Sequence, residues 1–219
     1  MKIQLSKFAA ALCLVLTLTL ASAGQTAAAP AATPAPTTLS AEEREAALKS
    51  LQATRDAFLK SIAGLSEQQW RFKPAPDRWS VAEVSEHIAV SESTLLGLVQ
   101  TKFMMSPADP AKRAEVAGKD ALILERIPDR SHKAQAPEFL KPTNRWATEA
   151  ELIKAFDESR KATMDYIRTT NDELRDHFGQ HPTLGTLDAY QWILLISAHS
   201  ERHTKQIEEV KADPNFPKQ

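Results

Sequence analysis

The chain has 219 residues, and its 27 lysines and arginines nearly balance 28 aspartates and glutamates, which gives a formal net charge of −1 at pH 7. This balance, without a run of basic residues, argues against a nucleic-acid-binding surface. The single cysteine, Cys13, excludes an intrachain disulfide, and no later residue can supply a thiolate nucleophile or metal ligand.

Residues 1–23 have the pattern of a secretory signal peptide. Lys2 and Lys7 flank the start of the segment, an apolar stretch follows at 8–20, and small residues lead to a cleavage site after Ala23. The apolar stretch is shorter than the about 20 residues that a membrane-spanning helix needs. We therefore expect an exported protein, periplasmic or secreted, with no membrane span once the signal is removed.

The composition changes after the signal. Residues 24–39 are rich in alanine, proline and threonine, with nothing large to bury, and this composition predicts a flexible linker. Residues 40–219 are long enough for one domain. Helical periodicity recurs in it and strand patterns are scarce. We therefore predict an all-α fold, a four-helix bundle with a long connection between helices two and three.

Capping boxes, in which a serine or threonine is followed three residues later by a glutamate or glutamine, mark where helices begin. Ser40 opens a predicted helix that ends near Gly64, and Ser66 opens a short helical turn. Ser80 opens the second long helix, whose predicted inward face includes His87 and Ser91.

The second and third long helices are separated by residues 106–145, a proline-punctuated stretch in which a short helix is predicted around 121–126. A connection of this length is unusual inside a compact domain, so we expect it to pack over a site or an edge. Thr148 then caps the third long helix, whose predicted inward face comprises Leu152, Phe156, Ser159, Thr163, Tyr166 and Ile167.

The last quarter of the domain begins with a predicted loop, residues 176–185, which contains two histidines and a proline. Thr186 is predicted to cap a fourth long helix over residues 187–211. The inward stripe of this helix comprises Trp192, Leu195, Ile196, His199, His203, Gln206 and Val210.

His199 and His203 lie one helical turn apart on this stripe, where Cβ atoms are about 5–6 Å apart. Two imidazoles so placed can converge on one metal ion at about 2.0–2.1 Å per bond. The alternative is two core imidazoles hydrogen-bonded to carbonyls or water, because burying them without partners would cost a few kcal/mol.

His87 has a similar inward position on the second long helix and would face the middle of the fourth if the two helices are neighbours. Three imidazole ligands with one open coordination position are typical of a catalytic rather than a structural zinc site. The same ligands accept Ni²⁺, Fe²⁺, Co²⁺ or Cu²⁺, since affinity order alone does not select zinc. We therefore predict a divalent metal site formed by His87, His199 and His203.

The spacing differs from that of thermolysin-like peptidases, in which a glutamate directly follows the first histidine of H-E-x-x-H and acts as general base. Ser200 has that place here, and Glu201 lies about 200° around the helix from His199, so we expect Glu201 to face solvent. Arg202 lies about 60° from His199, and it is either a pocket residue beside the site or a partner in a salt bridge.

Three further histidines lie in predicted loops. His181 lies in the loop that leads into the fourth helix, and Pro182 restricts it to extended backbone conformations, so our hypothesis is that His181 lines the open side of the pocket. His177 lies four residues before it, but Gly179 and Pro182 disfavour a continuous helix there. We expect His177 and His132 to be surface residues without a role in the site.

The motif W-S-x-x-E-x-x-x-H at Trp79–His87 is followed by His181-Pro182 and by H-x-x-R-H-x-x-Q-I at His199–Ile207. In this combination the chain resembles the DinB-like superfamily over roughly residues 41–211. The resemblance implies an up-down-down-up bundle with a divalent metal, commonly nickel or zinc, on the three inward histidines. The superfamily that the chain resembles also includes thiol-dependent enzymes, among them mycothiol-dependent maleylpyruvate isomerase and bacillithiol transferases, whose cofactors are cytoplasmic. Many other relatives have no known activity.

Two classes of function are consistent with such a site. In a metalloenzyme, a hydrolase or a transferase, the ion lowers the pKa of a bound water toward about 7, and this water acts on a small substrate. In a non-catalytic domain of the cell envelope, the site only binds metal or a ligand. Of the two, we favour the enzyme. We expect a small-molecule substrate, no nucleic-acid partner, and either a monomer or a homodimer; no residue is identified as catalytic.

Overall fold

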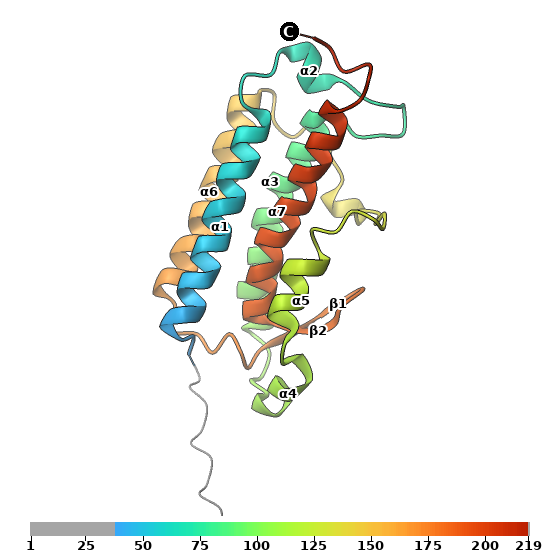
Figure 1. Cartoon of the computed structure of the whole chain (residues 1–219). Coiled ribbons are helices and arrows are strands. Elements are labelled where there is room, and N and C mark those ends of the chain that lie inside the picture. The colour runs from blue at the N-terminus through green and yellow to red at the C-terminus, as the bar shows by residue number, and fades with distance from the viewer. Residues whose placement is uncertain (1–37, 219) are drawn as a thin grey trace, which may run out of the picture. The chain divides into compact units, whose positions relative to one another are not determined.

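The computed structural model describes residues 38–218, so the predicted signal peptide and almost all of the predicted linker lie outside the described residues. Four long helices form a four-helix bundle, which confirms the predicted fold class (Figure 1). They are α1 (Ala41–Ile62), α3 (Val81–Leu98), α6 (Glu149–Thr169) and α7 (Ala189–Lys211). Within the described part of the chain, none of the helices has the length and apolar character to cross a membrane.

The predicted capping boxes are all present. In each, the hydroxyl of the cap accepts a hydrogen bond from a backbone N–H in the first turn, and the glutamate or glutamine three residues later accepts from the backbone N–H of the cap. Two otherwise unsatisfied donors are paired at each helix start, which stabilises the helix by about 1 kcal/mol. The caps are Ser40 for α1, Ser66 for the short helix α2 (Glu67–Arg71), Ser80 for α3 and Thr148 for α6.

Helices α1 and α7 run in parallel. The Tyr190 hydroxyl at the start of α7 donates to the Glu43 carbonyl at the start of α1, at 2.7 Å. At the other end, Lys211 Nζ donates to the Ser61 carbonyl at 2.9 Å. Parallel neighbours need a return connection along the bundle, which is supplied by α3 and α6.

Helices α1 and α6 are antiparallel, because Arg44 near the start of α1 donates to the carbonyls of Ile167 and Thr170 at the end of α6, at 2.6 and 2.7 Å. Helix α3 packs against α6 and α7, as α1 does, so α1 and α3 lie diagonally across the bundle. The order of directions is up-down-down-up, as the family resemblance implied (Figure 1).

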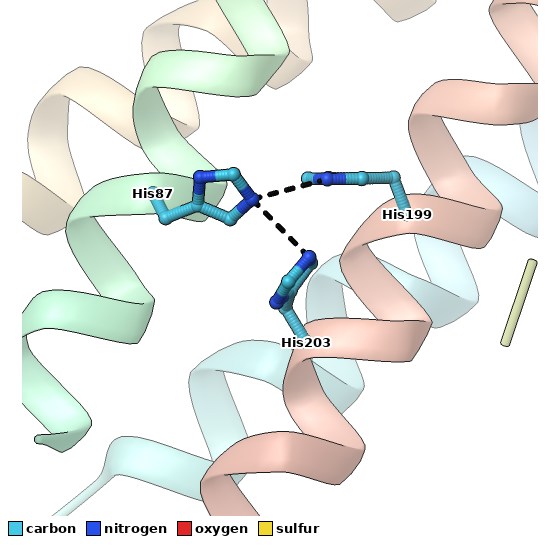
Figure 2. Close-up of side chains that lie close together, drawn as sticks. All are labelled: His87, His199 and His203. Atoms are coloured by element: carbon cyan, nitrogen blue, oxygen red, sulfur yellow. Dashed lines mark hydrogen bonds between the residues drawn. The ribbon is translucent and has the colours of Figure 1, made fainter. Parts of the chain in front are cut away.

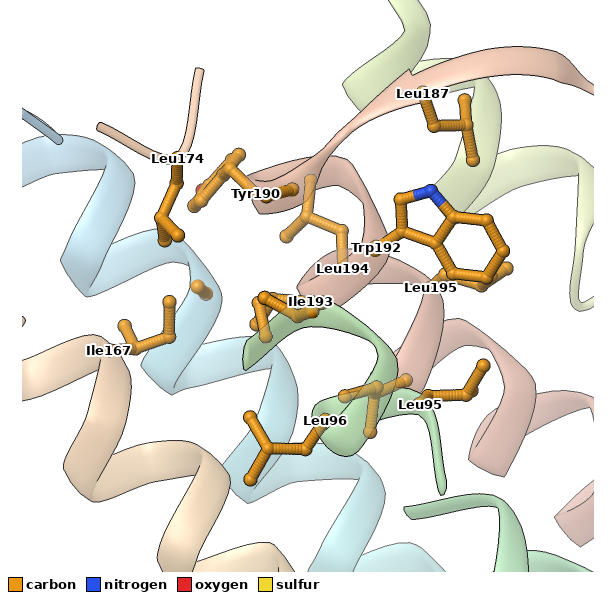
Figure 3. Packing of buried hydrophobic residues seen from close by; sticks show 14 of the residues in the cluster. Leu95, Leu96, Ile167, Leu174, Leu187, Tyr190, Trp192, Ile193, Leu194 and Leu195 are labelled. Atoms are coloured by element: carbon orange, nitrogen blue, oxygen red, sulfur yellow. The ribbon is translucent and has the colours of Figure 1, made fainter. Parts of the chain in front are cut away.

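The interior of the bundle has a polar layer between two apolar clusters. One cluster lies around the first half of α7 and the end of α3, where Leu95 and Leu96 pack near Ile193 and Leu195 (Figure 3). The other lies around Phe58 of α1 and the last turns of α7. Between them each long helix places polar side chains inward, namely Thr54, Ser91, Glu92, Arg160, Thr163, His199 and Ser200.

The long connection after α3 consists of short elements that pack beside α7. They are the π-helical turn η1 (Val99–Phe103), the 3₁₀ turn η2 (Pro110–Lys112), α4 (Arg113–Val116), α5 (Lys119–Arg126) and the 3₁₀ turn η3 (Glu138–Leu140). Helix α5 confirms the short helix predicted around 121–126, and it packs against α7. The connection therefore covers one side of the helix that has two of the predicted metal ligands.

The prediction of a loop over 176–185 was wrong. An antiparallel hairpin is formed by β1 (Phe178–His181) and β2 (Gly185–Asp188), with Gly179 opposite Leu187. Leu187 is fully buried, so the hairpin is fastened to the core.

The predicted cap of the fourth helix was also wrong, since α7 begins at Ala189 and its cap is Asp188 rather than Thr186. The Asp188 carboxylate accepts from the Gln191 backbone N–H at 2.7 Å, and the Gln191 side chain accepts from the Asp188 N–H at 3.1 Å. This complete capping box, two residues later in the chain, leaves Thr186 free to pair within the hairpin.

Gly179 is required by the packing of the hairpin. A Cβ at this position would overlap the ring of Phe103, which is buried and packs against Trp192 at a tilt, with ring centroids 5.0 Å apart. We expect Gly179→Ala to lower the free energy of unfolding by about 1–3 kcal/mol through overpacking, as measured by urea denaturation.

Gly97→Ala is the matched control, because nothing lies within 4 Å of a Cβ built on this helical glycine. Alanine there should stabilise α3 by about 0.5–1 kcal/mol. Equal effects of the two substitutions would contradict the close packing of Gly179 on Phe103.

Candidate metal centre

The structure brings the three predicted ligands together. His87 of α3 faces His199 and His203 of the antiparallel helix α7, and the three rings point toward a common centre (Figure 2). His87 Nε2 lies 3.2 Å from His199 Nε2 and 3.2 Å from His203 Nε2. His87 is 2% exposed, and His199 and His203 are partly exposed residues of α7.

The other ring nitrogens show where the protons are. His87 Nδ1 lies 2.8 Å from the Leu140 carbonyl, and His203 Nδ1 lies 2.8 Å from Gln206 Oε1. Both partners can only accept, so each Nδ1 has the proton and donates, and in a neutral ring Nε2 then has a lone pair. Two such lone pairs 3.2 Å apart have no proton between them and repel unless a cation lies at the centre.

All three rings favour the neutral form. Burial lowers the pKa of His87, and the hydrogen bond to Leu140 only partly offsets this. Burial lowers the pKa of His199 and of His203 well below the usual value, and the charge of neighbouring histidines lowers both further. At neutral pH the site therefore offers uncharged imidazoles, the form that binds a metal.

This lowered pKa predicts a pH dependence for the metal-free protein. In the unfolded chain these rings take up protons near pH 6.5, whereas in the folded chain they do so only at lower pH. The unfolded state thus binds more protons below about pH 6.5, and stability should fall as the pH decreases from 7 to 5. Thermal unfolding in the presence of a chelator should show this fall of stability with pH. The slope should be shallower in the triple variant His87→Asn/His199→Asn/His203→Asn. Equal slopes would contradict the lowered pKa values of the three histidines.

A first-row divalent ion fits these residues. At metal–nitrogen distances of about 2.0–2.1 Å, a nitrogen separation of 3.2 Å corresponds to an N–metal–N angle of about 100°. This lies between the angles of an octahedral face and of a tetrahedron, and either geometry leaves further positions open. Ser91 lies one turn after His87, and its hydroxyl is the one fully buried side-chain polar atom without a hydrogen-bond partner in the described part of the chain.

The long connection orients two of the ligands. Leu140, which accepts from His87, belongs to η3, in the second half of the connection. Gln206, which accepts from His203, also accepts from Arg130 Nη1 at 3.3 Å. Arg130 in turn binds both carboxylate oxygens of Glu209, at 2.5 and 2.7 Å. The expectation that the connection packs over a site is confirmed, and such outer contacts fix the orientation of ligand rings.

The end of the connection is anchored beside His87. The Glu86 carboxylate, 4% exposed, accepts backbone N–H groups from Thr143, Asn144 and Arg145 at 2.7, 2.9 and 3.3 Å. Asn144 has a positive φ of 61°, a conformation that places consecutive N–H groups around one acceptor. Glu86 thus fastens the connection to α3 directly beside His87, the candidate metal ligand on this helix.

The polar layer beside the histidines contains an ion pair that the sequence analysis missed. Arg160 of α6 and Glu92 of α3 are 0% and 1% exposed, and two guanidinium nitrogens bind the two carboxylate oxygens at 2.8 and 2.5 Å. Arg160 also donates to Thr54 Oγ1 and to Ser200 Oγ, each at 2.9 Å. The cluster joins all four long helices, and Ser200 directly follows His199 in α7.

Arg202 and Glu201 of α7 both have partners outside the histidine cluster. The Arg202 guanidinium donates to the backbone carbonyls of Ile127, Asp129 and His132, so it fastens the connection to α7. Glu201 pairs with Lys205 at 2.8 Å, and its side chain is exposed as predicted.

The remaining histidines have different environments. His132 is exposed and contacts the Ser131 hydroxyl at 2.9 Å. His177 is buried rather than on the surface, because its Nδ1 lies 3.1 Å from the Phe103 carbonyl, to which it donates. His181 ends β1 and packs on Trp192 with ring centroids 5.7 Å apart.

The DinB superfamily model matches residues 50–207, a segment that includes all three ligands and most of the bundle. The chain belongs to the DinB superfamily. Among curated proteins, the chain is similar to YuaE of Bacillus subtilis (strain 168), a protein without a characterised function. They share 27% identity over 150 residues, which is 68% of this chain and 88% of YuaE.

Solved structures of two four-helix bundle proteins resemble this member of the superfamily. YfiT from Bacillus subtilis is described as a probable metal-dependent hydrolase with an unusual four-helix bundle topology. It superimposes with a TM-score of 0.52 at 16% identity, over 82% of this chain and 92% of YfiT. The second, TT2238, gives a TM-score of 0.47 at 18% identity, over 76% of this chain and 98% of that one. At this level of identity the likeness to YfiT shows the fold.

Proposed function

We propose that this DinB superfamily member is a metal-dependent hydrolase of a small substrate, with nickel or zinc bound by His87, His199 and His203. The observation that supports this most is that the Nε2 atoms of three neutral imidazole rings converge. In two of these rings, His87 and His203, a hydrogen bond fixes the proton on Nδ1. The fold is shared with YfiT, which is described as a probable metal-dependent hydrolase.

The residues of the site would leave a bound divalent ion strongly electrophilic. A divalent ion on such ligands supplies Lewis acidity and lowers the pKa of a bound water toward about 7. His87, His199 and His203, as neutral imidazoles, would leave the charge of the ion uncompensated, whereas thiolates or carboxylates would reduce it. Leu140 and Gln206 hold the rings of His87 and His203 in place, so the ligands need not reorganise during a reaction.

Activity of metal-loaded protein tests this proposal. A panel of small ester, amide and thiol-transfer substrates should reveal hydrolytic turnover that disappears with a chelator and returns with Ni²⁺ or Zn²⁺. The His203→Ala variant should lose the turnover, and His132→Ala, which changes an exposed histidine, should keep it. Turnover that is unchanged by the chelator or by His203→Ala would contradict the proposal.

The second candidate is a non-catalytic domain that binds metal or a ligand. It is favoured by the composition of the centre, since the ligand cluster found among the described residues contains histidines alone, without a carboxylate that could act as a base. The buried carboxylate of the polar layer, Glu92, is already paired with Arg160. Stoichiometric metal binding without turnover on any substrate of the panel would favour this candidate.

We further propose that the protein acts in the periplasm or outside the cell, on the basis of the signal-like residues 1–23. The mature protein should begin near Gly24 and be recovered from the cell envelope or medium. Mass spectrometry of the intact protein from its natural host tests this, and a cytoplasmic protein that retains residues 1–23 would contradict it.

A further inference from the structure

The turn of the hairpin fixes the tautomer of His181. His181 Nδ1 lies 3.3 Å from the backbone nitrogen of Thr183 and 3.2 Å from that of Leu184. Backbone N–H groups can only donate, so Nδ1 accepts both hydrogen bonds with its lone pair. The proton of the neutral ring must therefore be on Nε2, which is a hydrogen-bond donor.

The neutral form of this ring is favoured by its surroundings. His181 is partly buried against Trp192, and burial lowers the pKa of His181 below its usual value. Protonation of Nδ1 would also break the hydrogen bonds that it accepts from the backbone N–H groups of Thr183 and Leu184. The ring is thus a neutral donor in a fixed orientation, on a hairpin that Leu187 ties to the core.

The position of His181 relates it to the metal centre. Trp192, on which it packs, lies seven residues before His199 in α7. Seven residues are close to two helical turns, so Trp192 and His199 share one face of α7 about 10 Å apart along its axis. His181 therefore packs on a residue of α7 about two turns before His199, and a short molecule would bridge that span.

We infer that His181 Nε2–H is a specificity donor, which binds a carboxylate or carbonyl oxygen at the far end of a small molecule whose near end is on the metal. The inference rests on the proposed metal site but not on hydrolysis, since a binding protein would use the same contact. It names the class of ligand: short bifunctional molecules with an oxygen acceptor several atoms from the group that binds the metal.

The tautomer can be tested without a metal. ¹⁵N NMR of the full chain, selectively labelled at histidine and assigned with the His181→Gln variant, should show the Nε2–H form of His181 at pH 7.5. A ring protonated at Nδ1 would overturn the inference, whatever the state of the metal site.

The ligand preference is tested with cobalt as a spectroscopic probe. Co²⁺-loaded protein is titrated with glutarate and with butyrate, which differ by one carboxylate, and visible absorption reports binding at the metal. Wild-type protein should bind glutarate about tenfold more tightly, the effect expected of one hydrogen bond to a charged group. His181→Phe should lose this preference, whereas His181→Gln, which retains an N–H donor, should keep part of it.

Cobalt content and far-UV circular dichroism, measured on each variant, separate this contact from effects on folding. If His181→Phe binds one equivalent of cobalt and still prefers glutarate tenfold, or if the wild type shows no preference, the inference is overturned while the metal site stands. If the wild type binds no cobalt, the proposed metal site and this inference both fall.

Discussion

The His199→Ala/His203→Ala double variant is expected to lose metal binding almost completely. Structural zinc sites with four ligands bind with about 10–16 kcal/mol, which is roughly 3 kcal/mol or about a hundredfold in affinity for each ligand. Removing two of the three Nε2 atoms should therefore weaken binding by about 10⁴-fold. Calorimetric titration with zinc or nickel, in competition with a chelator of known affinity, measures this change.

Two further variants are titrated in the same way, one with a smaller expected loss of affinity and one with none. Gln206→Ala removes only the acceptor that orients His203, and the loss of such an outer contact should cost about 10–100-fold. Glu201→Ala changes an exposed residue between the two ligands in sequence and should leave affinity unchanged. Equal affinities for the double variant and for Glu201→Ala would show that the metal binds elsewhere.

Arg160→Met is expected to destabilise the bundle by about 3–5 kcal/mol. The substitution leaves the buried Glu92 carboxylate without its counter-charge, and an uncompensated buried charge is costly. It also removes the donors to Thr54 and Ser200, so the four helices lose their shared polar contact. Urea denaturation measures the loss as a lower midpoint at an unchanged slope.

Arg55→Met is the matched control for this prediction. Arg55 forms a similar two-pronged pair with Asp157, at 2.8 and 3.0 Å, but both side chains are about one-third exposed. Loss of an exposed pair costs at most about 1 kcal/mol. The double variant Glu92→Leu/Arg160→Met, which removes both charges, should recover most of the stability; a cost as large as that of Arg160→Met alone would contradict the account.

The sequence predicts the helices and the metal ligands because both depend on local spacing. A capping box spans four residues, and the His199–His203 pair spans one turn, so each geometry is specified within one element. The prediction of His87 as the third ligand required the further assumption that α3 and α7 are neighbours, which the structure confirms. The predicted cap at Thr186 failed because Asp188 and Gln191 form a stronger, reciprocal cap that the same local rule could have identified.

Other features depend on contacts between distant segments and have no local pattern. The inward face predicted for α6 included Ser159, yet Arg160 is the buried residue, since its partner Glu92 lies 68 residues away in α3. The hairpin has strands of only four residues, too short for a clear alternation. His177 is buried, and its Nδ1–H donates a hydrogen bond to the Phe103 carbonyl, 74 residues earlier in the chain.

The metal content of the protein, purified without an affinity tag and analysed by elemental mass spectrometry, tests the central claim most directly. We expect one equivalent of a divalent first-row metal per chain in the wild type, nickel or zinc before iron, cobalt or copper. The variant in which His87, His199 and His203 are all replaced by alanine should contain none. A wild type that remains metal-free after incubation with each of these ions, or a triple variant that keeps a full equivalent, would contradict the three-histidine site.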